Sequence, residues 1–405
     1  MIEVPSLWRS RNFLLLFFGR FVSTAGSAIF FIAIVWGAAT KLGSVGAISL
    51  VLMATAIPSA ILSPFAGVLA DRKSKKNIIV FTDLASGIPL LIMILFLKVS
   101  FFQLWTLISI IFSIQILSTF FSPALQSLIP VIVKDEELSH ANALISMSSN
   151  FSQLIGMAVG GVLIALFGLH GAIFIDGMSF ILSGISEIFI VVDEKRKRPN
   201  KSLRKIFSDV KEGFGVVFKK PELGGLITIE AIVDFFGTPI FIFLPVIVSK
   251  YLDVGATQYG IMQAAMGVGT VLASILFSFI PEPRNKYSLL AIMTFLLGAC
   301  LIFIGVKPIY FVVLFSLLSI GFLAGIANVI QNVILQRNSP ENTRGRVFSF
   351  RSTLNSGMRP LSYGFAGLMS TFFPITDILI FFGIASGLPG FFYFFVRRKV
   401  SQKAS

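Results

Sequence analysis

Long apolar runs dominate this sequence, and only short polar breaks separate them. The chain has 405 residues, of which 55% are hydrophobic and 13% are charged. A soluble domain carries about 25% charged residues, so this composition leaves no room for a large water-exposed domain. A helix needs about 20 residues to cross a hydrocarbon layer of ~30 Å, and the runs reach that length. The sequence therefore predicts an all-α integral membrane protein.

Twelve of these segments are predicted to be membrane-spanning helices. They cover residues 13–40, 46–69, 77–97, 103–133, 142–168, 171–192, 223–249, 257–280, 287–306, 309–335, 346–373 and 376–396. The residues before the first segment show no cleavage-site pattern, so we expect a retained helix there and not a removed signal peptide. An even number of spans puts both termini on the same side of the membrane.

Lysine and arginine are distributed unevenly between the predicted loops. Most of them fall at the termini and in every second loop, whereas the alternate loops contain only Lys41, Lys98, Lys250 and Lys307. Because basic residues accumulate on the cytoplasmic side, we expect a multi-pass protein of the cell inner (plasma) membrane with both termini in the cytoplasm. The net charge of +14 then reflects orientation and contact with anionic lipid, and not nucleic-acid binding.

Side chains that bind metals or do covalent chemistry are scarce. Cys300 is the only cysteine, and the two histidines, His140 and His170, lie at predicted span ends. This pattern offers no disulfide and no zinc or haem site. The chain has no P-loop, and its spans hold no clustered nucleophile or metal-ligand set. We therefore expect no cofactor, no enzymatic activity and no direct use of ATP.

One long polar insert separates the spans into two groups of six. It contains the basic run KRKRPNKSLRK and then an amphipathic stretch at 206–218, which predicts a cytoplasmic linker with a surface helix. The expected domains are an N-terminal six-helix bundle (1–192), the linker (193–221) and a C-terminal six-helix bundle (222–405). The halves also show weak similarity, since Gln126 aligns with Gln331. Such internal symmetry is typical of secondary transporters, whose substrate sites lie near the membrane midplane.

The loop between the second and third predicted spans carries a specific pattern. It reads GVLADRKSKKNII at residues 67–79, and it resembles the signature loop G-x-L-A-D-R-x-G-R-K of the major facilitator superfamily. The matching residues are Gly67, Leu69, Ala70, Asp71, Arg72 and Lys76. Ser74 departs from the pattern, and the corresponding stretch of the second half, PEPRNKY at 281–287, lacks the aspartate.

Two more stretches resemble the branch of this superfamily that holds macrolide-efflux and siderophore-export proteins. They are FSPALQSLIPVIVKDEELSHANAL at 121–144 and ENTRGRVFSF at 341–350. The fifth span also resembles the exporter motif G-P-x-x-G-G, with Met157 in the place of proline. The resemblance implies two pseudo-symmetric six-helix bundles and a monomer that suffices for transport. It also implies a gating role for Gly67, Asp71, Arg72, Gly156, Gly160, Gly161 and Arg346.

Four charged residues are predicted to lie deep within spans, where an ion costs at least about 2.5–3.5 kcal/mol on insertion scales. They are Arg20, Glu230, Asp234 and Arg359. Since the first and seventh spans are pseudo-symmetric partners in the superfamily, we expect Arg20 to pair with Glu230 or Asp234 in some conformations. The two acids are one helical turn apart, so one of them is suited to hold an exchangeable proton. The alternative is a static charge network that locks helices together.

Arg359 has two interpretations. It either recognises a carboxylate or other anionic group of a substrate, or it forms a structural pair with Asp234 or Glu230. Asn355 lies on the same stripe of the eleventh span. By contrast, Asp83, Asp176 and Glu187 lie nearer the span ends, and we interpret them as interfacial caps or snorkelling groups.

Weaker polar positions complete the predicted site. Thr24 shares a helix face with Arg20, Gln115 lies on a polar face of the fourth span, and Asn150 and Gln153 lie on the fifth. Such residues either line a cavity or form hydrogen bonds between helices. Many proton-coupled members of the superfamily carry an arginine in the fourth span, and this chain has Gln115 in the vicinity instead.

The function predicted from these features is secondary active export of an amphipathic small molecule, such as a drug or natural product. Its energy would come from proton antiport with alternating access, so the expected partners are the substrate, protons and membrane lipid. The 44 phenylalanines favour an apolar pocket for such a substrate. One alternative is an exporter of a carboxylate siderophore, with Arg20 and Arg359 as anion contacts. Another is a lipid flippase that works without protons.

Overall fold

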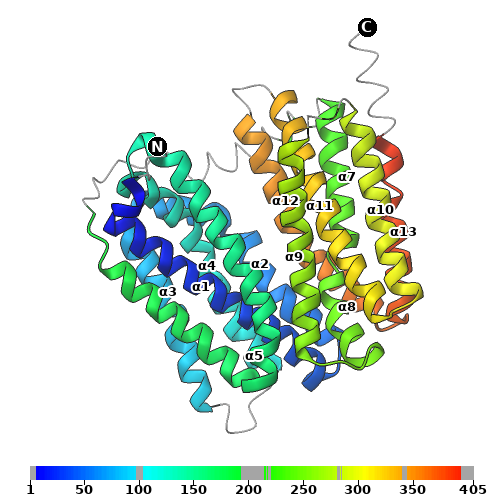
Figure 1. Cartoon of the computed structure of the whole chain (residues 1–405), viewed down its shortest axis with the longest axis horizontal. Coiled ribbons are helices and arrows are strands. Elements are labelled where there is room, and N and C mark those ends of the chain that lie inside the picture. Colours follow the sequence, from blue (N-terminus) through cyan, green and yellow to red (C-terminus); the bar gives the residue numbers. More distant parts are fainter. Residues whose placement is uncertain are drawn as a thin grey trace. The chain divides into compact units, whose positions relative to one another are not determined.

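The structure is a computed structural model that describes residues 6–96, 104–192, 214–215, 217, 220–280, 283, 285–339 and 344–393. Its described residues form helices joined by short connections, with no β-strand among them (Figure 1). In the first half the main helices are α1 (Arg11–Gly37), α2 (Val45–Arg72), α3 (Lys75–Phe96), α4 (Leu104–Ile132) and α5 (Leu138–Ile188). In the second half they are α7 (Pro221–Gly237), α8 (Ile240–Val246), α9 (Ala256–Phe279), α10 (Lys286–Val306), α11 (Tyr310–Asn338), α12 (Arg344–Met369) and α13 (Ile375–Gly387).

Each of the twelve predicted spans corresponds to one of these helices, to part of α5, or to α7 and α8 in succession. Short π-helices extend α1 (Ala38–Leu42) and α8 (Ile247–Tyr251). Within the described residues, nine helices are long and apolar enough to cross a membrane. In this set of nine helices, α5 is counted once, and α3 and α12 are not included. The arginines of α12 make that helix more polar than the others.

Helix α5 contains both the fifth and the sixth predicted spans. It covers 51 residues and breaks at Gly168, whose backbone angles are φ 65° and ψ −169°. This conformation is almost restricted to glycine, because a Cβ atom would strain it. A single residue therefore separates the two halves of α5 where a short loop was expected.

Contacts between residues divide the chain into two units. Unit 1 contains residues 1–42 and 54–203, and unit 2 contains residues 43–53 and 204–405. Most of the predicted linker, 193–221, lies outside the described residues, as do the side chains of Asp71 and Arg72 and the burial of Gly67. The expected domain boundaries and the gating role of those three residues stay predictions.

In unit 1, α5 packs along α1 and also against α3, while α3 contacts α4 (Figure 1). Phe13, Leu16 and Ile79 belong to its apolar core. Gly156 lies directly against α1, because a Cβ atom on this residue would come within 2.6 Å of the Ala25 carbonyl oxygen. Small residues permit such close approach of helices in a membrane. Gating by Gly156, Gly160 and Gly161 stays a prediction.

In unit 2, α11 packs against α9 and α10, α10 packs against α13, and α7 contacts α12 and α13. Ile330, Leu335 and Val347 belong to the apolar core of this unit. The start of α2 also belongs to unit 2, where the Ser49 hydroxyl donates to the Tyr363 carbonyl at 2.9 Å. This packing brings α7, α10, α11 and α12 together around the cavity described next.

Candidate functional site

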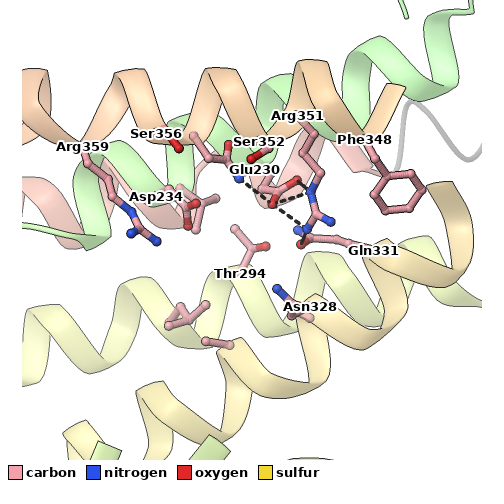
Figure 2. A pocket seen from close by; sticks show the side chains of 15 residues that line it. Glu230, Asp234, Thr294, Asn328, Gln331, Phe348, Arg351, Ser352, Ser356 and Arg359 are labelled. Carbon is pink, nitrogen blue, oxygen red and sulfur yellow. Dashed lines mark hydrogen bonds and ion pairs between the residues drawn. The ribbon is translucent and has the colours of Figure 1, made fainter. Parts of the chain in front are cut away.

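A cavity of about 450 Å³ lies within unit 2 (Figure 2). Small-molecule sites in proteins measure about 300–1,000 Å³, so the cavity is large enough for an organic ligand. Helix α7 contributes Glu230 and Asp234, and α12 contributes residues between Phe348 and Arg359. The apolar part of the wall consists of Val233, Leu297, Ala324, Ala327 and Phe348. The cavity thus combines an apolar wall with a charged side.

A buried ion pair joins α7 to α12 at this cavity. Arg351 Nε lies 2.9 and 2.8 Å from the two carboxylate oxygens of Glu230, and its Nη2 lies 2.7 Å from Oε1. Glu230 and Arg351 are 6% and 9% exposed. Arg351 also donates to Asn332 Oδ1 at 2.6 Å and to Gln331 Oε1 at 3.3 Å, while the Asn355 amide donates to Glu230 Oε1 at 3.1 Å. This network fixes α7, α11 and α12 to one another.

Asp234 and Arg359 lie farther along the same two helices. Figure 2 shows Asp234 between Arg359 and the Glu230–Arg351 pair. Asp234 is half-buried and Arg359 is exposed, and both line the cavity. Opposite charges attract Asp234 to Arg359 and to Arg351. The second acid of α7 is therefore held less tightly than the first, with its carboxylate facing the cavity.

Neutral polar groups complete the charged side of the cavity. Asn332 donates to Asn328 Oδ1 at 2.7 Å, which extends the Arg351 network along α11. Asn355 Oδ1 is buried and has no hydrogen-bond partner among the described residues. Thr294 from α10 also lines the cavity. These groups give a ligand both donors and acceptors next to the apolar wall.

Sequence reasoning missed the residue that binds Glu230. Arg351 is not among the predicted site residues, yet its side chain is buried against α7. The spacing contained a usable signal, because Arg351, Asn355 and Arg359 recur at every fourth position of α12 and residues four apart share a helix face. The partner amides, Gln331 and Asn332, were also not predicted.

The substrate-binding or coupling residues predicted in the first half lie in unit 1. The Arg20 guanidinium lies 4.9 Å from the centre of the Phe121 ring, and Thr24 Oγ1 is buried without a hydrogen-bond partner among the described residues. Gln115 is half-buried, whereas Asn150 and Gln153 are exposed. Since Glu230 and Asp234 belong to unit 2, the expected pairing of Arg20 with either acid stays a prediction. Arg346 is half-buried on α12, and its gating role stays a prediction as well.

The interpretation of Asp83, Asp176 and Glu187 as interfacial groups was wrong. They are 3%, 1% and 0% exposed. Asp83 on α3 and Glu187 on α5 both interact electrostatically with Arg20 on α1. Their position near the predicted span ends suggested contact with water, but position along a span does not say which face of the helix a residue occupies. Here the occupied face points into the bundle.

Comparison with known proteins supplies the family. A sequence model of the Major Facilitator Superfamily matches residues 16–363. Macrolide efflux protein A from Streptococcus pyogenes is 24% identical over 369 residues, which is 89% of this chain and 89% of the relative. The multidrug efflux pump Tap from Mycolicibacterium fortuitum is 23% identical over 396 residues, covering 92% of this chain and 94% of the pump.

Solved structures show the same fold. The nucleoside transporter NupG matches with a TM-score of 0.74 at 12% identity, covering 95% of this chain and 98% of that chain. A bacterial homologue of the human lysosomal transporter Spinster, inward-facing and occupied, matches with a TM-score of 0.74 at 16% identity, covering 96% and 97%. The fold, the efflux relatives and the apolar helices agree with the resemblance found in the sequence. This chain belongs to the Major Facilitator Superfamily, and it is a membrane transporter and not an enzyme.

Proposed function

We propose that this transporter exports an amphipathic small molecule by proton antiport with alternating access. The observation that carries the proposal is the cavity of unit 2, in which an apolar wall faces two acids and two arginines. An amphipathic substrate has one part for each side of such a cavity. Relatives named for macrolide and multidrug efflux support export as the direction.

Within this proposal the two acids of α7 have different tasks. Glu230 is bound by Arg351 and Asn355, so we assign it to the structure of the cavity. Asp234 faces the cavity and has weaker contacts, so we assign it to proton exchange. A carboxylate exchanges a proton more readily when no bidentate guanidinium occupies its oxygens. Arg359 then attracts the ionised form of Asp234, and this attraction is lost when Asp234 binds the proton.

A second candidate keeps the mechanism and changes the substrate to a carboxylate siderophore. The exposed guanidinium of Arg359 at the cavity favours it, because arginine binds carboxylates with two parallel hydrogen bonds. In both versions we place the protein in the plasma membrane, as a monomer with cytoplasmic termini. The residues of the N-terminal half that we propose to take part in substrate binding or coupling are Arg20, Thr24, Gln115, Asn150 and Gln153.

The test is uptake into everted membrane vesicles that contain the full-length protein. The probes are ethidium, erythromycin and a carboxylate siderophore, each with and without a protonophore. We expect one probe class to accumulate and its accumulation to stop with the protonophore. We expect Asp234→Asn to lower the rate of accumulation at least about tenfold, since one fixed carboxyl supplies the coupling. Glu136→Gln, which changes an exposed carboxyl, is the matched control and should keep the wild-type rate.

Two results would contradict the proposal. Accumulation that continues unchanged in the protonophore would exclude proton antiport. Movement of labelled phospholipid that needs no proton gradient, without accumulation of any probe, would make the protein a flippase.

A further inference from the structure

Three acids lie buried in one seam of unit 1, and the proposed function gives them no task. The seam is formed by α1, α3 and α5, and α5 packs against both of the other helices. Asp83 comes from α3, and Asp176 and Glu187 come from the second half of α5. Asp83 interacts electrostatically with both acids of α5. We call these three residues the acid seam.

The carboxyl groups of the acid seam have unused oxygens. Asp83 Oδ2, Asp176 Oδ2 and both carboxylate oxygens of Glu187 are buried and have no hydrogen-bond partner among the described residues. The Ser27 hydroxyl donates to Asp176 Oδ1 at 3.2 Å. Buried polar atoms are nearly always partnered, so four open oxygens in one seam indicate a site that takes up something small.

The charges of the seam do not balance when every group is ionised. Arg20 of α1 is the cation that interacts with Asp83 and Glu187. Helix α4 contributes the uncharged ring of Phe121, which lies under the Arg20 guanidinium. Lys76 of α3 donates to the Ile188 carbonyl at 2.7 Å, where it is half-buried near the end of the seam. Three buried carboxyl groups therefore share the seam with one buried guanidinium, which interacts with two of them. Burying a carboxylate without a partner is unfavourable, so such a group binds a proton instead.

The surroundings of the acids are built from small polar residues. Ser179 and Ser183 lie between Asp176 and Glu187 on the same face of α5, which spans about 16 Å at 1.5 Å per residue. Gly26 of α1 and Gly184 of α5 remove side-chain bulk at this face. A Cβ atom on Gly26 would lie 3.2 Å from Asp176 Oδ1, and one on Gly184 would lie 3.5 Å from Asp83 Cβ. Serine hydroxyl groups and glycine backbone therefore lie beside the acids.

We propose that the acid seam is a second proton-holding centre, located inside the N-terminal bundle and separate from the Asp234 site. A proton arriving from water forms an O–H bond on a carboxylate oxygen of Asp83 or Glu187, and the same bond breaks when the proton leaves. Arg20 is the fixed counter-charge of the carboxylate that remains ionised. The guanidinium also repels metal cations, so the seam selects a proton over Na⁺. The use of this proton in export rests on the proposed antiport, whereas its presence does not.

The first experiment asks whether the seam holds a proton, independently of transport. Infrared spectra of the purified full-length protein in nanodiscs are recorded near neutral pH, where exposed carboxyls are ionised. We expect a carbonyl band of a protonated carboxylic acid that loses intensity in Glu187→Gln and in Asp83→Asn and keeps it in Glu136→Gln. Both variants are close in size to the native residues and uncharged, so folding is expected to be retained.

Absence of the band in the wild type, or equal bands in the wild type and both seam variants, would overturn the proposal. So would loss of the band on adding NaCl but not choline chloride, because that result makes the seam a sodium site. Arg20→Lys keeps the positive charge and should keep the band, which separates a counter-charge from a merely structural arginine.

The second experiment tests coupling in the everted vesicles with ethidium and erythromycin as probes. We expect Glu187→Gln to abolish the stimulation of uptake by a proton gradient and to leave exchange of preloaded for external probe within about twofold of the wild type, since protonation is not needed for that exchange. If a proton gradient stimulates uptake equally in the wild type, the seam variants and Glu136→Gln, the coupling role is overturned. If the gradient does not stimulate uptake by the wild type, the proposed antiport is refuted, and the infrared experiment alone decides whether the seam holds a proton.

Discussion

At the scale of single residues, Arg351 is the best-connected side chain of the cavity. It reaches Glu230 on α7 and two amides on α11, so it links three helices. A guanidinium suits this task because its planar fork carries five donors at fixed angles. Lysine has one ammonium group on a flexible stem and does not reproduce the geometry. The residue is therefore expected to matter for stability as much as for binding.

We predict that Arg351→Ala lowers stability by about 3–5 kcal/mol, because it leaves the Glu230 carboxylate buried and unpaired. Arg351→Lys should recover only part of the loss. The measurement is the thermal midpoint of the purified protein in detergent, with Lys134→Ala as control, since Lys134 is exposed. A midpoint for Arg351→Ala equal to that of the control would show that the network contributes nothing.

A double variant, measured by the same thermal midpoint, tests whether Glu230 has a structural task in the cavity. If the carboxylate of Glu230 is structural, Glu230→Gln combined with Arg351→Met should be more stable than Arg351→Ala, because both charges leave together. This expectation needs no knowledge of the substrate.

Unusual charged residues could be recognised from the sequence only where they lie deep within a predicted span, and their roles stay predictions. Arg20, Glu230, Asp234 and Arg359 interrupt apolar runs, so their unusual position is visible in the sequence. Arg351 and Glu187 are near run ends, where charged residues are normally solvated. Their burial depends on neighbouring helices, and a single sequence does not contain that information.

At the scale of elements, the apolar runs predicted the helices well, since a membrane offers the backbone few other hydrogen-bonded forms. The break between the two halves of α5 was less predictable. A short loop was expected there, but one glycine in a conformation open almost only to glycine is enough. Among the described residues, none lies within 4 Å of a Cβ atom built at this position, so we expect any effect of substitution to come from the backbone.

We therefore predict that Gly168→Ala lowers stability by about 1–3 kcal/mol through backbone strain. Gly357→Ala is the matched control, because Gly357 also has free space around its Cβ position but lies inside helix α12. Alanine favours a helix over glycine, so this control should be neutral or stabilising. Thermal unfolding in detergent measures both variants. Equal midpoints would mean that the turn adapts without cost.

At the scale of the whole molecule, the family assignment follows from the length of the match and not from any single site. The loop at 67–79 pointed to the same family from the sequence. The resemblance assigns Asp71 to conformational cycling, and its side chain lies outside the described residues. A functional experiment is therefore the direct way to examine it.

We predict that Asp71→Asn slows efflux at least about tenfold and leaves insertion and folding intact, because the change removes one charge without changing the size of the side chain. Efflux from cells and the monodispersity of the purified protein are the two measurements. Asp135→Asn, at an exposed aspartate, controls for loss of a surface charge. Wild-type efflux in Asp71→Asn would remove the assigned role.

One property of the cavity wall makes it open to optical study. All three tryptophans, Trp8, Trp36 and Trp105, belong to unit 1, while Phe348 lines the cavity of unit 2. A tryptophan substituted for that phenylalanine, with the native three replaced by phenylalanine, would be the only tryptophan of the molecule. The wavelength of its fluorescence would then report how much water surrounds the indole in the cavity as substrate enters and leaves.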